Sequence, residues 1–126
     1  MKVLLGVTGS VAAKLTPKLV SAIIDKVPRV ELRVIATEIS LYFFCREEIV
    51  VPVLADKDEW PEGGYSKGGW VPHIDLGDWA DVLLIAPLTA NTLSDMAHGK
   101  ADKFLTSLVL AWPLEKPLIL APAMNT

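Results

Sequence analysis

The sequence lacks the features that several common functional classes require. It has one cysteine, Cys45, so no disulfide can form within the chain, and we expect a buried, unreactive thiol in a reducing, cytoplasmic environment. Twelve lysines and arginines stand against 15 acidic residues, a formal charge of -3, with no basic stripe for nucleic-acid phosphates. No apolar run approaches the roughly 18 residues that span a bilayer. We therefore expect neither a nucleic-acid nor a membrane partner.

Metal ligands and standard nucleotide motifs are equally scarce. His73 and His98 stand far from each other and from Cys45, which gives no zinc-ligand spacing. The segment "GVTGSVAAK" lacks the glycines of the dinucleotide fingerprint G-x-G-x-x-G and the Walker spacing G-x-x-x-x-G-K. We therefore predict no metal site, and neither a standard dehydrogenase nor a P-loop nucleotidase is favoured.

What the chain does have is an alternation of strand and helix patterns. Strand patterns occupy residues 2–7, 31–36, 81–87 and 117–122, with a possible short strand at 50–54. The apolar runs at 81–87 and 117–122 are expected to be buried strands. Helical patterns occupy 11–27, 89–98 and 104–112, while 56–69 has the composition of a loop. This alternation predicts a single domain, residues 1–126, with a three-layer α/β fold around a mostly parallel sheet. An apolar content of 52% also suggests surface buried against other subunits.

Small polar residues follow three of the predicted strands. In parallel sheets the carboxyl ends of the strands share one edge, where ligands bind. A glycine and a serine before a helix can offer N–H groups and a hydroxyl to a phosphate. Taken singly, however, each of the first two segments is better explained as an ordinary helix cap. The coincidence of all three favours a ligand site. The segments are Thr8-Gly9-Ser10, Thr89-Ala90-Asn91-Thr92 and Met124-Asn125-Thr126.

His73 precedes a segment that leads into a buried strand, so we expect it near the same edge. An imidazole there could hold or move a proton near neutral pH, or it could be a structural histidine bonded to a backbone carbonyl. Both interpretations stay open on the residues alone. The acidic run Asp56, Asp58, Glu59 and Glu62 is most simply interpreted as a solvated loop.

Five segments extend over essentially the whole chain: "VTGSVAAK", "VIATEISLYFF", "DKDEW", "VPHIDLGDWADVLLIAPLTANTLSDMAHGKADKFLT" and "PLILAPAMNT". Together, and in this order, they closely resemble the flavin-containing cysteine decarboxylases, in particular the phosphopantothenoylcysteine decarboxylases of coenzyme A biosynthesis. The resemblance implies a Rossmann-like or flavodoxin-like topology, FMN as cofactor, and homotrimers or multiples of trimers with flavin between subunits. The implied substrate is the small molecule 4′-phosphopantothenoylcysteine. The flavin would accept a hydride from its cysteine Cβ to leave a thioaldehyde, which loses CO₂ readily to give an enethiol.

The resemblance also assigns roles to individual residues. His73 corresponds to the family's catalytic histidine, and Asn125 to the asparagine that holds the substrate carboxylate. The implied FMN contacts are Gly9, Ser10 and Val11 at the phosphate, Thr37 and Phe43 beside the cofactor, Thr89, Ala90, Asn91 and Thr92 from the next turn, and Ala123 and Met124 from the last.

Three departures from the family pattern qualify this interpretation. The family usually continues after "PAMN" into a methionine-tryptophan pair and a segment whose cysteine helps to protonate the enethiol, so we expect a C-terminally truncated chain that retains flavin binding. Lys14 stands one position early, and Lys103 replaces a commoner asparagine.

Two alternative functions remain: a peptidyl-cysteine decarboxylase that stops at the enethiol, and a non-catalytic regulatory subunit of a phosphatase. "DKDEW" and "HIDLGDWAD" favour the coenzyme A branch, and retention of His73 and Asn125 counts against the regulatory subunit.

Overall fold

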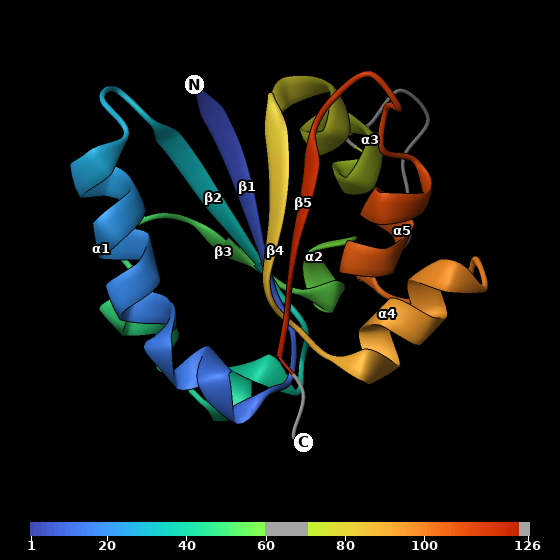
Figure 1. Cartoon of the computed structure of the whole chain (residues 1–126), viewed down its shortest axis with the longest axis horizontal. Helices are drawn as coiled ribbons and strands as arrows, with labels where there is room; N and C mark the ends of the chain where they lie inside the picture. Colours follow the sequence, from blue (N-terminus) through green and yellow to red (C-terminus); the bar gives the residue numbers. More distant parts are fainter. Residues whose placement is uncertain (60–70, 124–126) are drawn as a thin grey trace.

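The computed structural model describes residues 1–59 and 71–123, which form a parallel sheet (Figure 1). Its strands are β1 (Lys2–Val7), β2 (Glu31–Ala36), β3 (Val53–Leu54), β4 (Val82–Leu88) and β5 (Leu118–Pro122). They lie in the order β3-β2-β1-β4-β5, and all of the pairings are parallel. The mostly parallel sheet expected from the alternating pattern is therefore confirmed.

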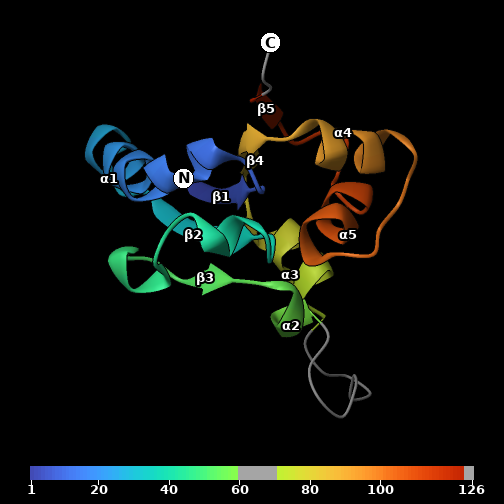
Figure 2. The same cartoon turned by 90° about the horizontal axis from the view of Figure 1, so that it is seen from below.

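Helices cover both faces of the sheet. They are α1 (Thr16–Lys26), α2 (Asp56–Glu59), α3 (Pro72–Trp79), α4 (Ala90–Ala97) and α5 (Phe104–Leu110), together with the short 3₁₀ segments η1 (Val11–Leu15), η2 (Ser40–Tyr42) and η3 (Arg46–Glu48). Figures 1 and 2 place α1 on one side of the sheet and α2 to α5 on the other, which gives the predicted three layers. Within residues 1–59 and 71–123, no helix has the length and hydropathy needed to cross a membrane.

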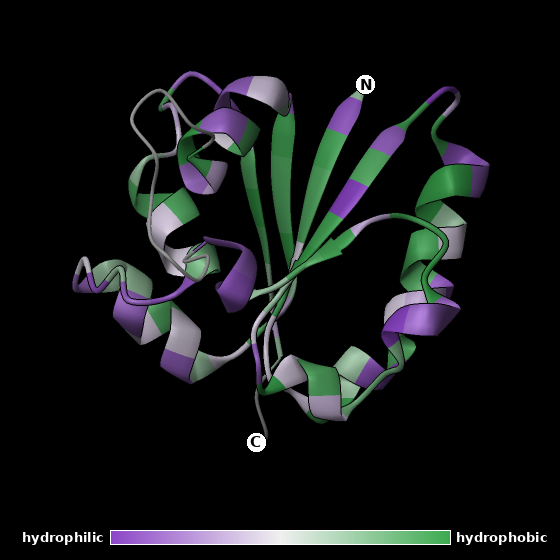
Figure 3. Ribbon diagram, turned by 180° about the vertical axis from the view of Figure 1, so that it is seen from behind, coloured by the Kyte–Doolittle hydropathy of each residue, from purple (hydrophilic) through white to green (hydrophobic). Residues whose placement is uncertain are grey.

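The core has two parts because β1 is buried on both faces. Val3, Leu5 and Val7 alternate toward the layer of α1, while Leu4 contributes to the cluster on the side of α3 and α5. Figure 3 shows hydrophobic residues running along the central strands. Burial on both faces is why this strand is a continuous apolar run rather than an alternating one.

The predicted helix over 11–27 is divided by its own sequence. Ser10 caps η1, and its hydroxyl accepts a hydrogen bond of 3.1 Å from the backbone N–H of Ala12. The α-helix starts at Thr16 with Pro17 in its first turn, where the missing N–H of proline costs no hydrogen bond. The segment is therefore a 3₁₀ turn followed by an α-helix.

Two short helices were not expected from the pattern. The prediction of a loop over 56–69 is wrong for residues 56–59, which form α2. At the start of this helix, the carboxylate of Asp58 accepts the backbone N–H of Ala55 at 2.8 Å. Residues 60–70 lie outside the described part of the chain. Helix α3 begins with Pro72, and the carboxylate of Asp75 accepts the N–H of Val71 at 2.8 Å. Polar groups at the helix start, rather than apolar periodicity, mark this element.

Two further features bear on the surface of the molecule. Cys45 is exposed, so the expectation of a buried thiol is wrong. The edge strand β5 is exposed along its whole length, and Ile119 retains 52% of its accessible surface, so the expectation of a buried strand at 117–122 is wrong.

The strand order reverses between β1 and β4, and such a switch point opens a crevice at the carboxyl ends of the strands.

Candidate functional site

A buried threonine joins the carboxyl ends of β1 and β4. The hydroxyl of Thr8 donates to the carbonyl oxygen of Pro87 at 2.7 Å and accepts the backbone N–H of Thr89 at 2.9 Å. Its own backbone N–H also donates to the Pro87 carbonyl, at 3.2 Å. Thr8 has no exposed surface, and the two hydrogen bonds of its hydroxyl are partly buried. They fix the loop after β1 against the turn after β4 at the switch point.

A neutral cavity of about 490 Å³ opens at these two strand ends. Its lining residues are Gly9, Ser10, Val11, Ala12, Phe43, Thr89 and Ala123, all of which are uncharged. Among the hydrogen bonds of the described residues, none uses the backbone N–H of Gly9 or Val11. Together with the Ser10 hydroxyl, these donors suit a phosphate, because no carboxylate lies in the lining to repel it.

Gly9 allows a third loop to approach this cavity. A Cβ atom at this position would lie 2.4 Å from Cγ2 of Ile39, much closer than real Cβ contacts. Ile39 directly precedes η2, and it follows the end of β2 at Thr37 and Glu38. Glycine is therefore required for the segment after β2 to pack against the loop after β1.

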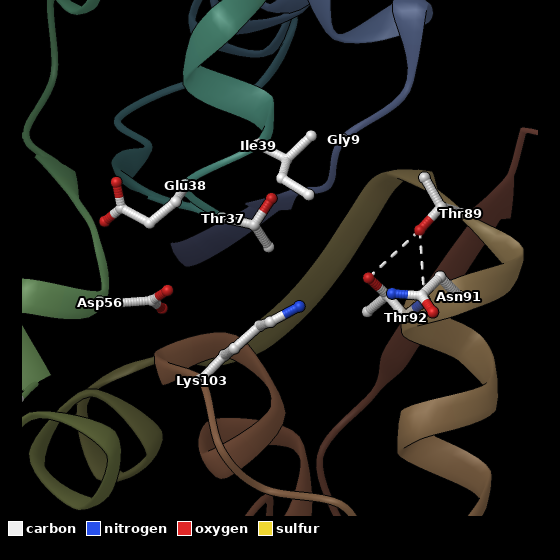
Figure 4. A pocket seen from close by; sticks show the side chains of 9 residues that line it. All are labelled: Gly9, Thr37, Glu38, Ile39, Asp56, Thr89, Asn91, Thr92 and Lys103. Carbon is white, nitrogen blue, oxygen red and sulfur yellow. Dashed lines mark hydrogen bonds between the residues drawn. The ribbon is translucent and has the colours of Figure 1, made fainter.

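A second cavity, of about 190 Å³, adjoins the first and is charged. Its lining residues are Gly9, Thr37, Glu38, Ile39, Asp56, Thr89, Asn91, Thr92 and Lys103. Figure 4 shows the amine of Lys103 extending into the space between Asp56 and the turn that carries Thr89 to Thr92. Gly9 and Thr89 line both cavities, so the two form one continuous candidate site.

The helix-cap interpretation holds for the turn after β4. Thr89 caps α4, and its hydroxyl oxygen accepts the backbone N–H of Thr92 at 3.2 Å while donating to the Thr92 hydroxyl at the same distance. Thr37 is similarly occupied, because its hydroxyl oxygen accepts the backbone N–H of Ser40 at 3.3 Å. Capping and ligand binding are compatible here, because each oxygen keeps a second lone pair.

Most of the residues expected to bind a cofactor lie together. Gly9, Ser10, Val11, Phe43, Thr89 and Ala123 line the neutral cavity, and Thr37, Asn91 and Thr92 line the charged one. Ala90, the first residue of α4, lines neither cavity. Met124 and Asn125 lie outside the described residues.

Several residues of the site were not expected from the sequence. Thr8 was predicted to lie at a polar strand end, but its hydrogen bond to Pro87 of β4 was not, because it depends on the direct pairing of β1 with β4. Asp56 and Lys103 reach the charged cavity from α2 and from the start of α5. No local pattern marks them, because only the folded chain brings these elements to the strand ends.

His73 lies at the first turn of α3 and lines neither cavity. Its ring Nδ1 pairs with Oε1 of Glu59, so the interpretation as a histidine bonded to a backbone carbonyl is wrong. The solvated-loop interpretation is also wrong for Glu59, which is 1% exposed. Within residues 1–59 and 71–123, no cluster of three or more histidine, cysteine, aspartate or glutamate residues could hold a metal ion.

The Flavoprotein family model matches residues 1–126. The chain belongs to the Flavoprotein family. It is 48% identical over 125 residues to the phosphopantothenoylcysteine decarboxylase of Mus musculus, a match that covers 99% of this chain and 60% of the relative. The chain thus spans about 60% of the length of this curated relative.

Solved structures share the fold as well as the sequence. A PPC decarboxylase mutant complexed with pantothenoylaminoethenethiol superimposes with a TM-score of 0.91 at 42% identity, over 99% of this chain and 68% of the other. The FMN binding protein AtHal3 gives a TM-score of 0.90 at 42% identity, over 99% and 66%. These matches confirm the Rossmann-like or flavodoxin-like class expected from the resemblance.

Proposed function

We propose that this chain is the FMN-binding part of an enzyme that decarboxylates 4′-phosphopantothenoylcysteine to 4′-phosphopantetheine in coenzyme A biosynthesis. The observation that carries the proposal is the convergence of the Gly9–Val11 loop and the Thr89–Thr92 turn at the switch point of the sheet. It is supported by the similarity to a phosphopantothenoylcysteine decarboxylase and to an FMN binding protein.

The two cavities fit different parts of FMN. The phosphate is assigned to the neutral cavity, where Gly9 and Val11 offer backbone N–H groups and Ser10 a hydroxyl. The charged cavity contains Glu38 and Asp56, whose carboxylates would repel a phosphate. It suits the uncharged, hydrogen-bonding part of the cofactor instead. Ala90 and Met124 complete the proposed set of cofactor contacts.

Catalysis needs both an oxidant and groups that handle the substrate. When bound, FMN supplies the hydride acceptor that makes loss of CO₂ from a cysteine derivative possible. His73 is proposed to hold or move a proton at its imidazole, and Asn125 to donate hydrogen bonds to the substrate carboxylate. Because His73 lines neither cavity of its own chain, we place it at the flavin site of a second copy.

A homo-oligomer, a trimer or a multiple of trimers, is therefore part of the proposal. Support comes from exposed apolar surface on β5, where Leu118, Ile119 and Leu120 retain between 36% and 52% of their accessible surface. A further cavity of about 280 Å³, with residues of η1, α1, β4 and β5 in its lining, lies next to this strand. Light scattering of the purified chain would test the assembly, and a monomer at micromolar concentration would contradict it. We also place the protein in the cytoplasm, in keeping with its single cysteine.

The central test is a titration with FMN followed by an assay with two substrates. We expect quenching of flavin fluorescence on binding, and CO₂ release from 4′-phosphopantothenoylcysteine but not from a peptide ending in cysteine. Release from the peptide alone would favour a peptidyl-cysteine decarboxylase. FMN binding without release from either substrate would favour a non-catalytic subunit, and absence of FMN binding would contradict the proposal at its base.

A further inference from the structure

One buried carboxylate contacts both the backbone and the ring of His73. Glu59 is the last residue of α2 and is 1% exposed. Its Oε2 accepts the backbone N–H of His73 at 3.1 Å, and its Oε1 pairs with Nδ1 of the same residue. The two residues stand 14 positions apart in the chain. Fixing two points of one residue restricts both its backbone position and the rotation of its side chain.

Burying this carboxylate is costly unless strong partners compensate, because a charge without them loses several kcal/mol of hydration. The start of α3 provides such partners. His73 occupies the first turn of the helix, where backbone N–H groups lack acceptors within the helix and the helix dipole favours negative charge. The His73 side chain keeps 25% of its surface exposed, so the ring is held from one side while another remains accessible.

The chemistry of the pair determines which ring nitrogen carries the hydrogen. An ionised carboxylate can only accept hydrogen bonds, so in the neutral ring Nδ1 must be the donor and Nε2 keeps its lone pair. We propose that Glu59 is a positioning residue that fixes His73 in the Nδ1–H tautomer and presents Nε2 as the proton acceptor. The inference rests on the proposed function, in which His73 handles a proton.

A merely structural role for Glu59 would be to cap α3, and the same helix offers a matched control. Asp75 accepts the backbone N–H of Val71 at 2.8 Å at this helix start, also through a carboxylate. Its hydrogen bond there involves Val71 and not the ring of His73. Asp75→Asn therefore weakens the helix start while leaving the contact between Glu59 and His73 in place.

The decisive variant is Glu59→Gln, read by ¹⁵N NMR of the imidazole in a His98→Asn background that leaves one histidine. The backbone N–H of His73 can only donate, so the glutamine oxygen should turn toward it and the amide NH₂ toward Nδ1. Nδ1 must then accept, and the hydrogen moves to Nε2. With the ring neutral, we expect Nδ1–H in the parent and in Asp75→Asn, and Nε2–H in Glu59→Gln.

Two results of the NMR measurement would overturn the inference. One is a parent protein in which Nε2 carries the hydrogen, which can be measured even if Glu59→Gln fails to fold. The other is a folded Glu59→Gln variant that keeps Nδ1–H. Glu59→Asp retains a carboxylate and should restore the Nδ1–H signal at least in part.

Kinetics of the FMN-loaded enzyme provide the second measurement. Glu59→Gln should lower kcat on the order of 100-fold, with KM and the FMN affinity within about twofold of the parent, because only the acceptor nitrogen is changed. Asp75→Asn should keep the parental kcat, and an equal loss in both variants would reduce Glu59 to a helix cap. If the tautomer shifts as expected but His73→Asn still turns over normally, the proposed function fails while the positioning of His73 by Glu59 stands.

Discussion

The strand-end cavities and the Glu59–His73 pair are held in place by different means. The cavities follow from the sheet, because β1 and β4 are direct neighbours and Thr8 bonds their following loops together. The pair depends on two side chains from separate short helices, α2 and α3. Topology therefore places the first region, whereas side-chain packing places the second.

The two regions also differ in charge and so in what they can do. The larger cavity has an uncharged lining rich in potential donors, which suits the binding of an anion. The pair joins a buried carboxylate to a partly exposed imidazole, which suits the handling of a proton. Substitutions should thus separate the functions, with binding lost in one region and turnover in the other.

The largest expected effect is at the pair. His73→Asn should lower the rate of CO₂ release roughly 1000-fold, because a proton-handling imidazole contributes about 10²–10⁴-fold. The FMN affinity should stay within about twofold of the parent, because Gly9, Ser10 and Val11, the residues proposed to hold the phosphate, are unchanged. Stopped assays of CO₂ and fluorescence titration of FMN would measure the two quantities.

His98→Asn is the matched control for this variant. His98 lies at the end of α4, where its Nδ1 is 2.7 Å from the carbonyl oxygen of Ser94, so its loss should alter neither quantity. A His73→Asn protein that releases CO₂ at the parental rate would contradict the assigned role. A His73→Asn protein that also loses FMN affinity would show that the two regions do not have separate functions.

The next largest effect is expected at Gly9. Gly9→Val places a Cβ about where Ile39 now packs, 2.4 Å from its Cγ2, so the loops after β1 and β2 must separate. Overpacking of this kind costs about 1–3 kcal/mol, and we expect the FMN affinity to fall on the order of 100-fold. Fluorescence titration would measure the loss.

Gly77→Ala provides the comparison. A Cβ there meets Cδ1 of Leu108 at 3.7 Å, an ordinary contact, and alanine is also the better helix former. This variant should bind FMN like the parent and be no less stable. Parental affinity in Gly9→Val would show that the loop after β1 is not the cofactor site.

The sequence predicts the sheet well because burial on both faces leaves a strong signal. The strand expected at residues 2–7 coincides with β1, and that at 31–36 coincides with β2. The short helices α2 and α3 were missed for a physical reason. Helix α2 consists of four acidic and basic residues, which show no apolar periodicity. Helix α3 contains Pro72 and Gly77, so its sequence resembles a turn, and only the structure shows that Leu76 is in the core.

For the candidate site, the same division applies. Polar residues after parallel strands must gather at one edge, so the meeting of Gly9 with Thr89 could be foreseen. The contribution of Lys103 and the burial of Glu59 could not, since both depend on helices that pack from elsewhere in the chain. The apolar run of β5 likewise predicts a strand but not its exposure, because burial depends on what covers the sheet.

A smaller effect is expected from Thr8→Val, which keeps the shape of the side chain and removes the hydroxyl. The variant loses a hydrogen bond to the Pro87 carbonyl and leaves the partly buried backbone N–H of Thr89 without its acceptor. We expect the free energy of unfolding to fall by about 1–3 kcal/mol and the FMN affinity to fall about tenfold. Urea denaturation and FMN titration would measure both.

Thr16→Val separates stability from binding. Thr16 is also buried, and its hydroxyl donates to the carbonyl oxygen of Ala13 at 2.7 Å, but it lines neither of the two strand-end cavities. It should lose stability without a matching loss of affinity. If Thr8→Val behaves in the same way, the bridge between β1 and β4 supports the fold but not the site.

The smallest expected effect concerns Lys103, which places a cation in the charged cavity beside Asp56. Lys103→Asn, which restores the residue commoner in the flavin-containing cysteine decarboxylases, should weaken FMN binding about two- to fivefold at low salt. A partly exposed cation attracts the anionic cofactor by no more than about 1 kcal/mol. The difference should shrink near 1 M salt, where the screening length falls to about 3 Å.

Lys100→Asn removes a lysine from the same loop but outside the cavity, where its ammonium lies 3.6 Å from Asp102. Equal weakening by both substitutions would mean that net charge alone attracts the cofactor. Tighter binding in Lys103→Asn would mean that the amine does not attract the anionic cofactor. Weakening by Lys103→Asn alone would show that a side chain placed by helix packing contributes to cofactor binding at the strand ends. The strand-end cavities would then depend on side-chain packing as well as on topology, and would differ from the Glu59–His73 pair only in degree.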